Sequence, residues 1–266
     1  MKTLKLSSKK LFKVLLNMLL LRKKKFYVAG MRRSGNHAFV NWLKNALEAE
    51  NVSFDNPGNE KKFHVTPSGN TVFINHLNKI SNKNYFRMIF NNFFIIAKSK
   101  NIIISTEDYT CKNCFRVPVC NHYFLVKRSL LNLIASRYKK VSDGLQNGRC
   151  LEIYNIDKNF FNTLKKLYTT KDYISWEFDE WLLSSEYRRL FLKQLNLNFD
   201  SRPDVSKQGG GSSFIGYKLP EKKDLLERYK LLDLPSSIIE NLYQSDCADF
   251  LTDDEKNYLA KNYHTQ

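Results

Sequence analysis

Short apolar runs of strand length alternate with stretches of helical periodicity along the first half of this chain. Residues 26–29 and 123–126 are such runs. Residues 101–109 contain a third one, three isoleucines, and two acidic residues follow it near the end of the segment. Apolar residues also recur at three- and four-residue spacing over residues 38–47, which predicts a helix with one face on a sheet. This alternation predicts an α/β fold with a central, mainly parallel sheet and helices on both faces.

A chain of 266 residues suits one domain, which we place at residues 26–266. Residues 1–25 form a separate segment, in which lysines and arginines surround an apolar stretch. Two interpretations of this segment remain open: a basic amphipathic helix on an anionic membrane surface, or a helix packed on the domain. No apolar stretch reaches the roughly 20 residues needed to span a bilayer. The sequence therefore predicts a cytoplasmic protein, which in the first interpretation is peripheral on the membrane surface.

The first apolar run leads into a glycine turn of the kind that binds anions. Gly30 and Gly35 have the spacing of the two glycines in G-x-x-x-x-G-K-[ST], and the predicted helix follows directly. A helix N-terminus offers backbone N–H groups and a positive dipole to an anion. Asn36 and His37 replace the Lys and the Ser/Thr of that motif, so the hydroxyl that would hold Mg²⁺ is missing. The turn points to a phosphorylated ligand other than ATP, and the alternative is an ordinary strand-to-helix turn with exposed arginines.

A second pair of polar residues follows the apolar run 123–126. Arg128 stands at the end of this predicted strand, and Ser136 lies eight residues later in the next predicted helix. In open α/β sheets, ligands bind beyond the carboxyl ends of the strands. Both side chains can therefore converge on one anion there.

With these two motifs, the sequence resembles the sulfotransferases that use 3′-phosphoadenosine 5′-phosphosulfate (PAPS). In that family a [KR]-S-G-T-T-like core binds the 5′-phosphosulfate, and an Arg-x7-Ser pair binds the 3′-phosphate. The run Arg33-Ser-Gly-Asn-His37 is similar to the first motif, and Arg128 with Ser136 is similar to the second. The resemblance implies a P-loop-like fold of sulfotransferase type. It also implies transfer of a sulfuryl group from PAPS to an acceptor hydroxyl, giving the bisphosphate PAP and a sulfate ester.

The resemblance further implies which residues contact the donor. The 5′-phosphosulfate would be held by Arg32, Arg33, Ser34, Gly35, Asn36, His37 and Ala38, and the 3′-phosphate by Arg128 and Ser136. Arg33 would also stabilise charge during transfer. A glycine-rich run stands where the family has a loop over the 3′-phosphate; its members are Gly209, Gly210, Gly211, Ser212 and Ser213. For this run a flexible linker is the alternative interpretation. The scheme requires no metal ion.

Sulfuryl transfer also needs a base that takes the proton of the acceptor hydroxyl. Glu107 ends an apolar strand one segment before Arg128, where the family carries its catalytic His or Glu, and it is our first choice. Asp108 is the adjacent alternative, although alternation along an extended chain sends its side chain to the opposite side. His76 ends another apolar strand, residues 71–76, and is the third candidate.

Charge and cysteine content leave other classes of function open. Lysines and arginines exceed acidic residues by 43 − 26 = +17, which favours an acidic partner without choosing one. The resemblance favours a carbohydrate hydroxyl, on a glycan or glycolipid, as acceptor. The alternatives are a small-molecule or nucleotide kinase with a degenerate P-loop, and a non-catalytic basic nucleic-acid-binding protein; no zinc-finger or RRM signature is present, so we expect no nucleic acid. Cys111, Cys114 and Cys120 are predicted to be reduced thiols, because a structural zinc site has four ligands and only the nearby His122 would supply the fourth.

Overall fold

The structure is a computed structural model, and it describes most of the predicted domain. The described residues are 23–47, 65–68, 71–75, 91, 93–108, 120–148, 152–201 and 226–263. The N-terminal residues 1–22, His76 and the run from Gly209 to Ser213 lie outside these ranges.

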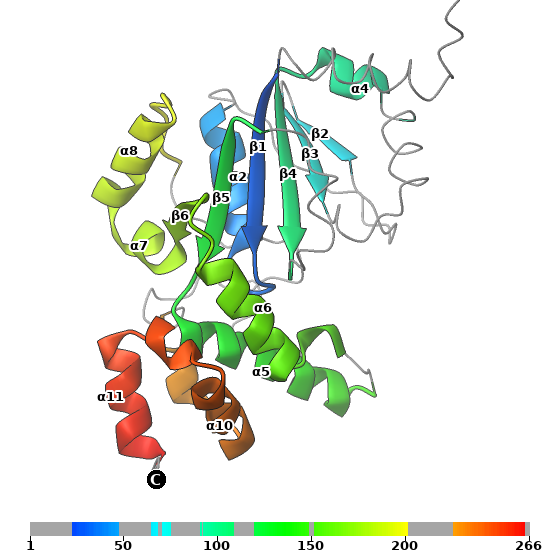
Figure 1. Ribbon diagram of the computed structural model, residues 1–266. Helices are drawn as coiled ribbons and strands as arrows, with labels where there is room; N and C mark the ends of the chain where they lie inside the picture. The colour runs from blue at the N-terminus through cyan, green and yellow to red at the C-terminus, as the bar shows by residue number, and fades with distance from the viewer. Residues whose placement is uncertain are drawn as a thin grey trace, which may run out of the picture.

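Within the described ranges, six strands form one sheet (Figure 1). They are β1 (Lys24–Gly30), β2 (Val65–Ser68), β3 (Thr71–Asn75), β4 (Asn101–Glu107), β5 (His122–Lys127) and β6 (Ile174–Glu177). Their order in the sheet is β2-β3-β4-β1-β5-β6. All neighbouring strands from β3 to β6 pair in parallel, and β2 pairs with β3 in the antiparallel sense. The predicted α/β fold with a mainly parallel sheet is confirmed.

The helices follow the strands along the chain. They are α2 (Asn36–Leu47), α4 (Phe93–Lys98), α5 (Leu130–Gln146), α6 (Lys158–Tyr168), α7 (Phe178–Leu183), α8 (Ser185–Gln194), α10 (Ser236–Gln244) and α11 (Asp253–Asn262), with the 3-10 turns η3 (Glu152–Tyr154), η4 (Arg228–Leu231) and η5 (Cys247–Phe250). Within the described part of the chain, no helix combines the length and apolar character of a membrane span.

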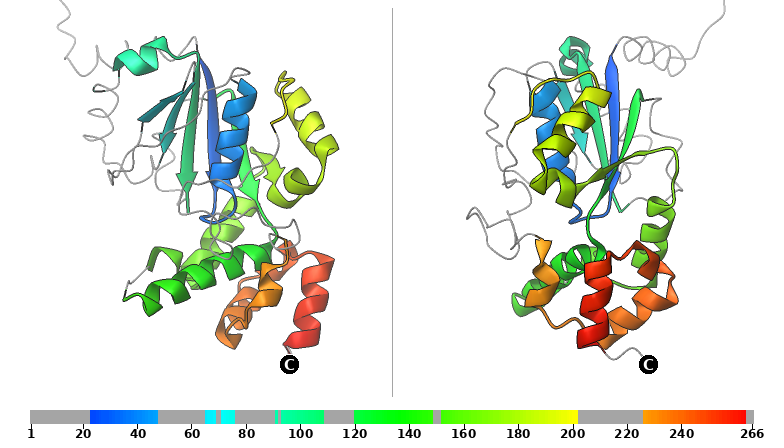
Figure 2. Two further views of the ribbon diagram at one scale, coloured as in Figure 1. Left: turned by 180° about the vertical axis from the view of Figure 1, so that it is seen from behind. Right: turned by 90° about the vertical axis from the view of Figure 1, so that its left-hand side faces the viewer.

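Strand β1 shows why the sheet is covered on both faces. Phe26 and Val28 pack into one apolar core with residues of α2, α7 and α8, whereas Tyr27 and Ala29 pack into a second core with α5, α6, α10 and α11. Alternate side chains of a strand point to opposite faces, so a strand buried on both faces is apolar throughout. Figure 2 shows α2 and α8 on one side of the sheet and α6 on the other, which confirms the predicted helices on both faces.

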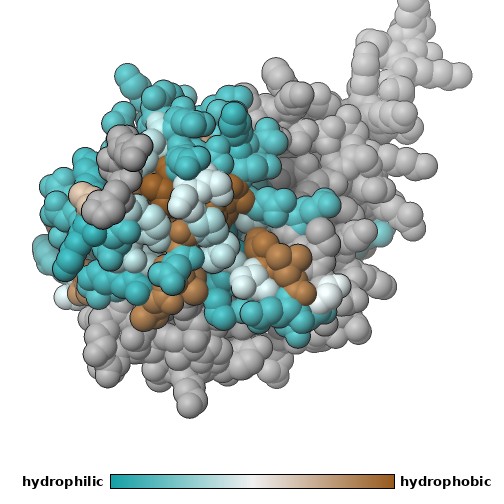
Figure 3. All heavy atoms as spheres, turned by 90° about the horizontal axis from the view of Figure 1, so that it is seen from below, coloured by the Kyte–Doolittle hydropathy of each residue, from teal (hydrophilic) through white to brown (hydrophobic). Residues whose placement is uncertain are grey.

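The carboxyl ends of the central strands meet at one edge of the sheet. Gly30 of β1 is in register with Glu107 of β4 on one side and with Val126 of β5 on the other. Helices α5, α10 and α11 lie below this edge (Figure 1). Seen from below, the described residues present a mostly hydrophilic surface, with apolar side chains gathered in separate patches (Figure 3). The polar residues predicted from the two motifs therefore belong to a single region between the sheet edge and these helices.

Candidate anion site at the carboxyl edge of the sheet

Two residues of the glycine turn between β1 and α2 have a positive φ, Arg33 and Gly35. Gly35 has a φ of 109°, a conformation that side chains other than glycine rarely adopt. A Cβ atom at Gly30 would collide with the side chain of Asn36, and one at Gly35 would collide with the ring of Phe178. The first hydrogen bond of the helix runs from Phe39 N to Gly35 O at 3.0 Å. Its earlier backbone N–H groups therefore have no partner within the helix.

Three arginines from distant parts of the chain form a cluster, in which Arg33 and Arg228 contact Ser136 and Arg128 contacts Arg33. Arg33 Nε donates to Ser136 Oγ at 3.1 Å, and Arg228 Nη1 approaches the same oxygen at 3.4 Å. Arg128 Nη1 donates to the carbonyl oxygen of Arg33 at 3.3 Å. Ser136 is fully buried, and Arg128 and Arg228 are 6% and 4% exposed. The turn motif and the Arg-x7-Ser motif thus form one site, to which η4 contributes a third arginine.

Burial and like charge make this cluster electrostatically unfavourable. Burial, followed by the charges of Arg128 and Arg33, lowers the pKa of Arg228 to about 8. Burial also lowers the pKa of Arg128 to about 10, against the opposing effect of Asp179. A guanidinium keeps its charge at neutral pH, so repulsion among these buried charges lowers the stability of the folded protein. An anion with two negative charges placed among these groups would offset that cost.

Carboxylates and an aromatic ring fix the start of α5, beside Arg128. The guanidinium of Arg128 lies over the ring of Phe178, 4.7 Å from its centre. Asp179 Oδ2 accepts a hydrogen bond from Ser129 N at 2.8 Å. Glu255 of α11 accepts from Ser129 Oγ and Leu131 N, both at 2.6 Å. The segment that joins Arg128 to the helix of Ser136 is therefore held from α7 and α11.

Glu107, the first candidate for the base, lies beside the turn. Its Oε2 is 3.5 Å from Arg32 Nε, and its Oε1 is 3.8 Å from His37 Nε2, an ion pair only when the imidazole is protonated. The whole residue is 8% exposed. The structure thus brings Glu107 next to the predicted 5′-phosphosulfate residues, as its place at the end of β4 predicts.

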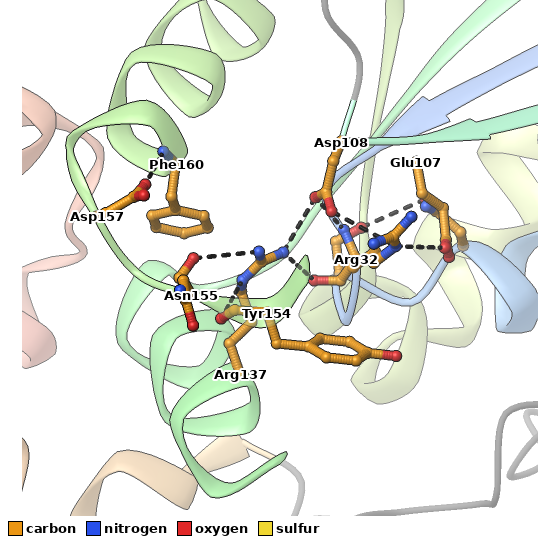
Figure 4. A network of polar contacts seen from close by, with 10 residues as sticks. Arg32, Glu107, Asp108, Arg137, Tyr154, Asn155, Asp157 and Phe160 are labelled. Atoms are coloured by element: carbon orange, nitrogen blue, oxygen red, sulfur yellow. Dashed lines mark hydrogen bonds and ion pairs between the residues drawn. The ribbon is translucent and has the colours of Figure 1, made fainter. Parts of the chain in front are cut away.

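Asp108 differs from the expectation that it faces the opposite side of the sheet. Its φ is 51°, so the backbone turns into the left-handed region directly after the strand and the alternation ends there. Asp108 Oδ1 accepts from Arg32 N at 2.9 Å and from Arg137 Nη1 at 3.0 Å. Both carboxylates consequently approach Arg32, but Asp108 is engaged in an ion pair with Arg137 (Figure 4).

The remaining residues of the turn are placed around the start of α2. Ser34 is fully buried and its Oγ donates to Asn36 Oδ1 at 3.3 Å, while Ala38 packs against the core on the α2 side of the sheet. This bond orients the amide of Asn36, whose buried Nδ2 has no hydrogen-bond partner among the described residues. A buried amide donor beside a glycine turn fits an anion-binding role.

Several predicted residues lie outside the described part of the chain. These are His76, Gly209, Gly210, Gly211, Ser212, Ser213, Cys111 and Cys114. Their predicted roles therefore stay predictions. Among the residues that the structure does describe, no three metal-ligating side chains come together, and Cys120 and Cys247 are buried.

Sequence reasoning did not find two residues of this site, Arg228 and Arg137. Arg228 stands in the C-terminal helical region without any motif, and its backbone N donates to Asn132 Oδ1 at 2.8 Å across 96 positions of sequence. Arg137 directly follows Ser136 in the sequence, and this position next to a predicted site residue could have indicated it.

Comparison of the chain with protein families, with curated proteins and with solved structures found no match. The geometry of the site therefore carries the functional argument.

Proposed function

We propose that this protein transfers a sulfuryl group from PAPS to an acceptor hydroxyl, giving PAP and a sulfate ester. The observation that carries the proposal is a cluster of three arginines next to a glycine turn and a carboxylate: Arg33 and Arg228 contact Ser136, and Arg128 contacts the Arg33 carbonyl oxygen. PAPS has two anionic groups, a 3′-phosphate and a 5′-phosphosulfate. The site offers two matching regions, the buried arginine cluster and the turn at the start of α2.

The hydrogen-bond donors of the arginine cluster suit a phosphate monoester. Guanidinium groups match phosphate oxygens with paired N–H donors, and the lowered pKa values of Arg128 and Arg228 mark charge that an anion would balance. We assign the 3′-phosphate to Arg128, Ser136 and Arg228. Residues 32–38 would hold the 5′-phosphosulfate through side chains and through the N–H groups of the first turn of α2.

The chemistry of transfer is assigned to residues at the turn. In the proposed reaction the acceptor oxygen forms a bond to sulfur, and the bond from sulfur to the bridging oxygen of the phosphosulfate breaks. Glu107 would take the proton of the acceptor hydroxyl, and Arg33 would stabilise the negative charge that develops on the leaving PAP. Arg33 is suited to this role because its charge is held at the turn by Ser136, and burial already lowers its pKa.

Calorimetric titration with PAP, and separately with ATP plus Mg²⁺, tests the proposed donor. We expect saturable PAP binding, weakened by Arg128→Ala through loss of a charge-assisted hydrogen bond of about 1.5–3 kcal/mol. Arg189→Ala is the matched control, because Arg189 is an exposed arginine of α8 paired with Glu186. Binding of ATP with Mg²⁺ in the absence of PAP binding would replace this proposal by the kinase alternative.

Turnover tests the proposed base. PAPS labelled with ³⁵S is supplied with a panel of mono- and disaccharides, and also with water alone as the acceptor. Water gives PAP, sulfate and two protons, so this second assay does not require the natural acceptor. We expect Glu107→Gln to reduce turnover roughly 10²–10⁴-fold with little change in PAP affinity. Equal turnover by the variant would remove Glu107 from this role. Sulfation of a sugar in the panel would support the proposed carbohydrate acceptor.

A further inference from the structure

A partly buried ion pair joins the residues that directly follow the proposed base and the proposed 3′-phosphate serine. Asp108 follows Glu107 at the end of β4, and Arg137 follows Ser136 in α5. Arg137 Nη1 lies 3.0 Å from Asp108 Oδ1 (Figure 4). The Arg137 side chain is 4% exposed and that of Asp108 is 22% exposed. This one contact therefore links the two elements that carry these roles.

Both partners also hold the glycine turn through Arg32. Asp108 Oδ1 accepts from the backbone N of Arg32 at 2.9 Å, and Arg137 Nη1 approaches the Arg32 carbonyl oxygen at 3.5 Å. Asp108 N donates to Gly30 O at 3.1 Å, which ties the end of β4 to the end of β1. The other nitrogens of Arg137 donate to the carbonyl oxygens of Tyr154 and Asn155, both at 3.3 Å. The pair is the centre of a network that spans the turn, β4, α5 and η3.

Asp108 also affects how strongly Arg32 engages the proposed base. Arg32 Nε lies 3.5 Å from Glu107 Oε2 and 3.5 Å from Asp108 Oδ2, so its charge is shared between two carboxylates. Without the charge of Asp108, Arg32 would be drawn to Glu107, because opposite charges attract more strongly in a site with little water. A carboxylate held by a guanidinium is a poorer proton acceptor.

We propose that the Asp108/Arg137 pair is a positioning element that sets the place and the charge balance of Glu107 relative to the donor site. This inference rests on the proposed sulfuryl transfer. Asp108 and Arg137 touch neither donor nor acceptor in this scheme. Their charge acts on Glu107 by sharing the guanidinium of Arg32, and Asp108→Asn can keep the hydrogen bond from Arg32 N, so we expect the effect of this charge on turnover to exceed its effect on the affinity for PAP.

The test is a double-mutant cycle between Asp108→Asn and Glu107→Gln. Asparagine tolerates the left-handed backbone and can still accept from Arg32 N, so the substitution removes mainly the charge. Turnover is measured as ³⁵S-sulfate released from PAPS to water, and PAP affinity is measured by calorimetry. We expect Asp108→Asn to lower turnover about 10- to 100-fold in the wild-type background and to leave PAP affinity within about threefold.

The decisive comparison is the same substitution in the Glu107→Gln background, where we expect no further loss of turnover, because Asp108 acts through the carboxylate that is already absent. A residue needed only for folding would cost the same factor in both backgrounds. Asp143→Asn is the matched control. Asp143 pairs with Lys139 in α5, the helix that also carries Arg137, but both side chains are about one-third exposed. We therefore expect neither turnover nor PAP affinity to change.

A second variant keeps the test informative if Asp108→Asn alone does not fold. Removing the charge of Asp108 leaves the buried guanidinium of Arg137 without this counter-charge. The double substitution of Asp108→Asn with Arg137→Met is therefore made in parallel and tested in the same cycle. Equal losses with and without Glu107, or a PAP affinity that falls in parallel with turnover, would overturn the positioning role alone. Absence of PAP binding by the unaltered protein would overturn the proposed function and this inference with it.

Discussion

Replacing Arg228 by methionine should make the ligand-free protein more stable and its binding of PAP weaker. Arg228 is 4% exposed, and its guanidinium lies among the charges of Arg128 and Arg33. Methionine has a similar length, no charge and a flexible apolar side chain, so it can fill the same space. The substitution thus removes the like charge without creating a large cavity.

The size of the stability change follows from the pKa of Arg228. A decrease from 12.5 to about 8 is about 4.5 pH units, which at about 1.4 kcal/mol each gives about 6 kcal/mol as the upper bound of the cost of this charge. The lost hydrogen bond to Ser136, at 3.4 Å, opposes this gain by about 1 kcal/mol. We expect a net gain of at least about 1 kcal/mol, which raises the melting temperature by roughly 2–4 °C.

The effect on binding has the opposite sign. A charge-assisted hydrogen bond contributes about 1.5–3 kcal/mol, so the dissociation constant for PAP should rise roughly 10- to 150-fold. Differential scanning calorimetry and isothermal titration measure the two quantities on one preparation. Arg228→Lys, which retains the charge, should keep the wild-type stability and an intermediate affinity. Arg189→Met at an exposed pair should change neither. A variant that loses stability and affinity together, or that keeps the wild-type affinity, would refute the reasoning.

Gly35→Ala should lower stability by about 1–3 kcal/mol because alanine is strained at a φ of 109°, and it should also weaken PAP binding, because the added Cβ collides with Phe178. Gly148→Ala is its control: φ is 65° there but no atom lies within 4 Å of the added Cβ, so calorimetry should show a loss of stability with unchanged PAP affinity. Glu255→Ala should cost about 2–5 kcal/mol, because it leaves Ser129 Oγ and a backbone N–H of α5 without their acceptor. Burial raises the pKa of Glu255 above 4.5, so the stability contributed by its protonated form is fully present below that pH and is lost as pH rises through the raised pKa. The difference between wild type and variant in urea unfolding should therefore be larger at pH 4.5 than at pH 8, and a larger difference at pH 8 would contradict this.

The sequence was most informative where one physical rule determined the local structure. Strands β1, β4 and β5 are buried on both faces of the sheet, so short apolar runs in the sequence were enough to identify them. The spacing of two glycines identified the turn before α2. Ser136 was also predicted to lie in the helix after the strand of residues 123–126, and it lies in α5. In each case the residues that decide the structure are neighbours along the chain, so a single sequence suffices to read them.

Asp108 and Arg228 show where this reasoning fails. The side of Asp108 was inferred from strand alternation, but a φ of 51° ends the alternation at that residue, and nothing in the run Thr-Glu-Asp signals it. Arg228 acquires its role only by tertiary contact with Asn132 and Ser136, which lie more than 90 positions away. A single sequence records neither a local backbone turn of this kind nor a long-range contact of one arginine.

The source of positive charge distinguishes this site from that of a nucleotide triphosphatase. In the G-x-x-x-x-G-K-[ST] motif a flexible lysine and a metal-binding hydroxyl follow the second glycine, and here Asn36 and His37 take their places. The charge comes instead from guanidinium groups of the turn, of the end of β5 and of η4, three parts of the chain that meet only in the folded protein. These groups are fixed by Ser136, by the Arg33 carbonyl oxygen and by the ring of Phe178 before any ligand arrives. Fixed guanidinium forks select an anion by the geometry of its oxygens. A terminal phosphate monoester presents such oxygens together with two negative charges, and this match is the physical reason for assigning the cluster to the 3′-phosphate of PAPS.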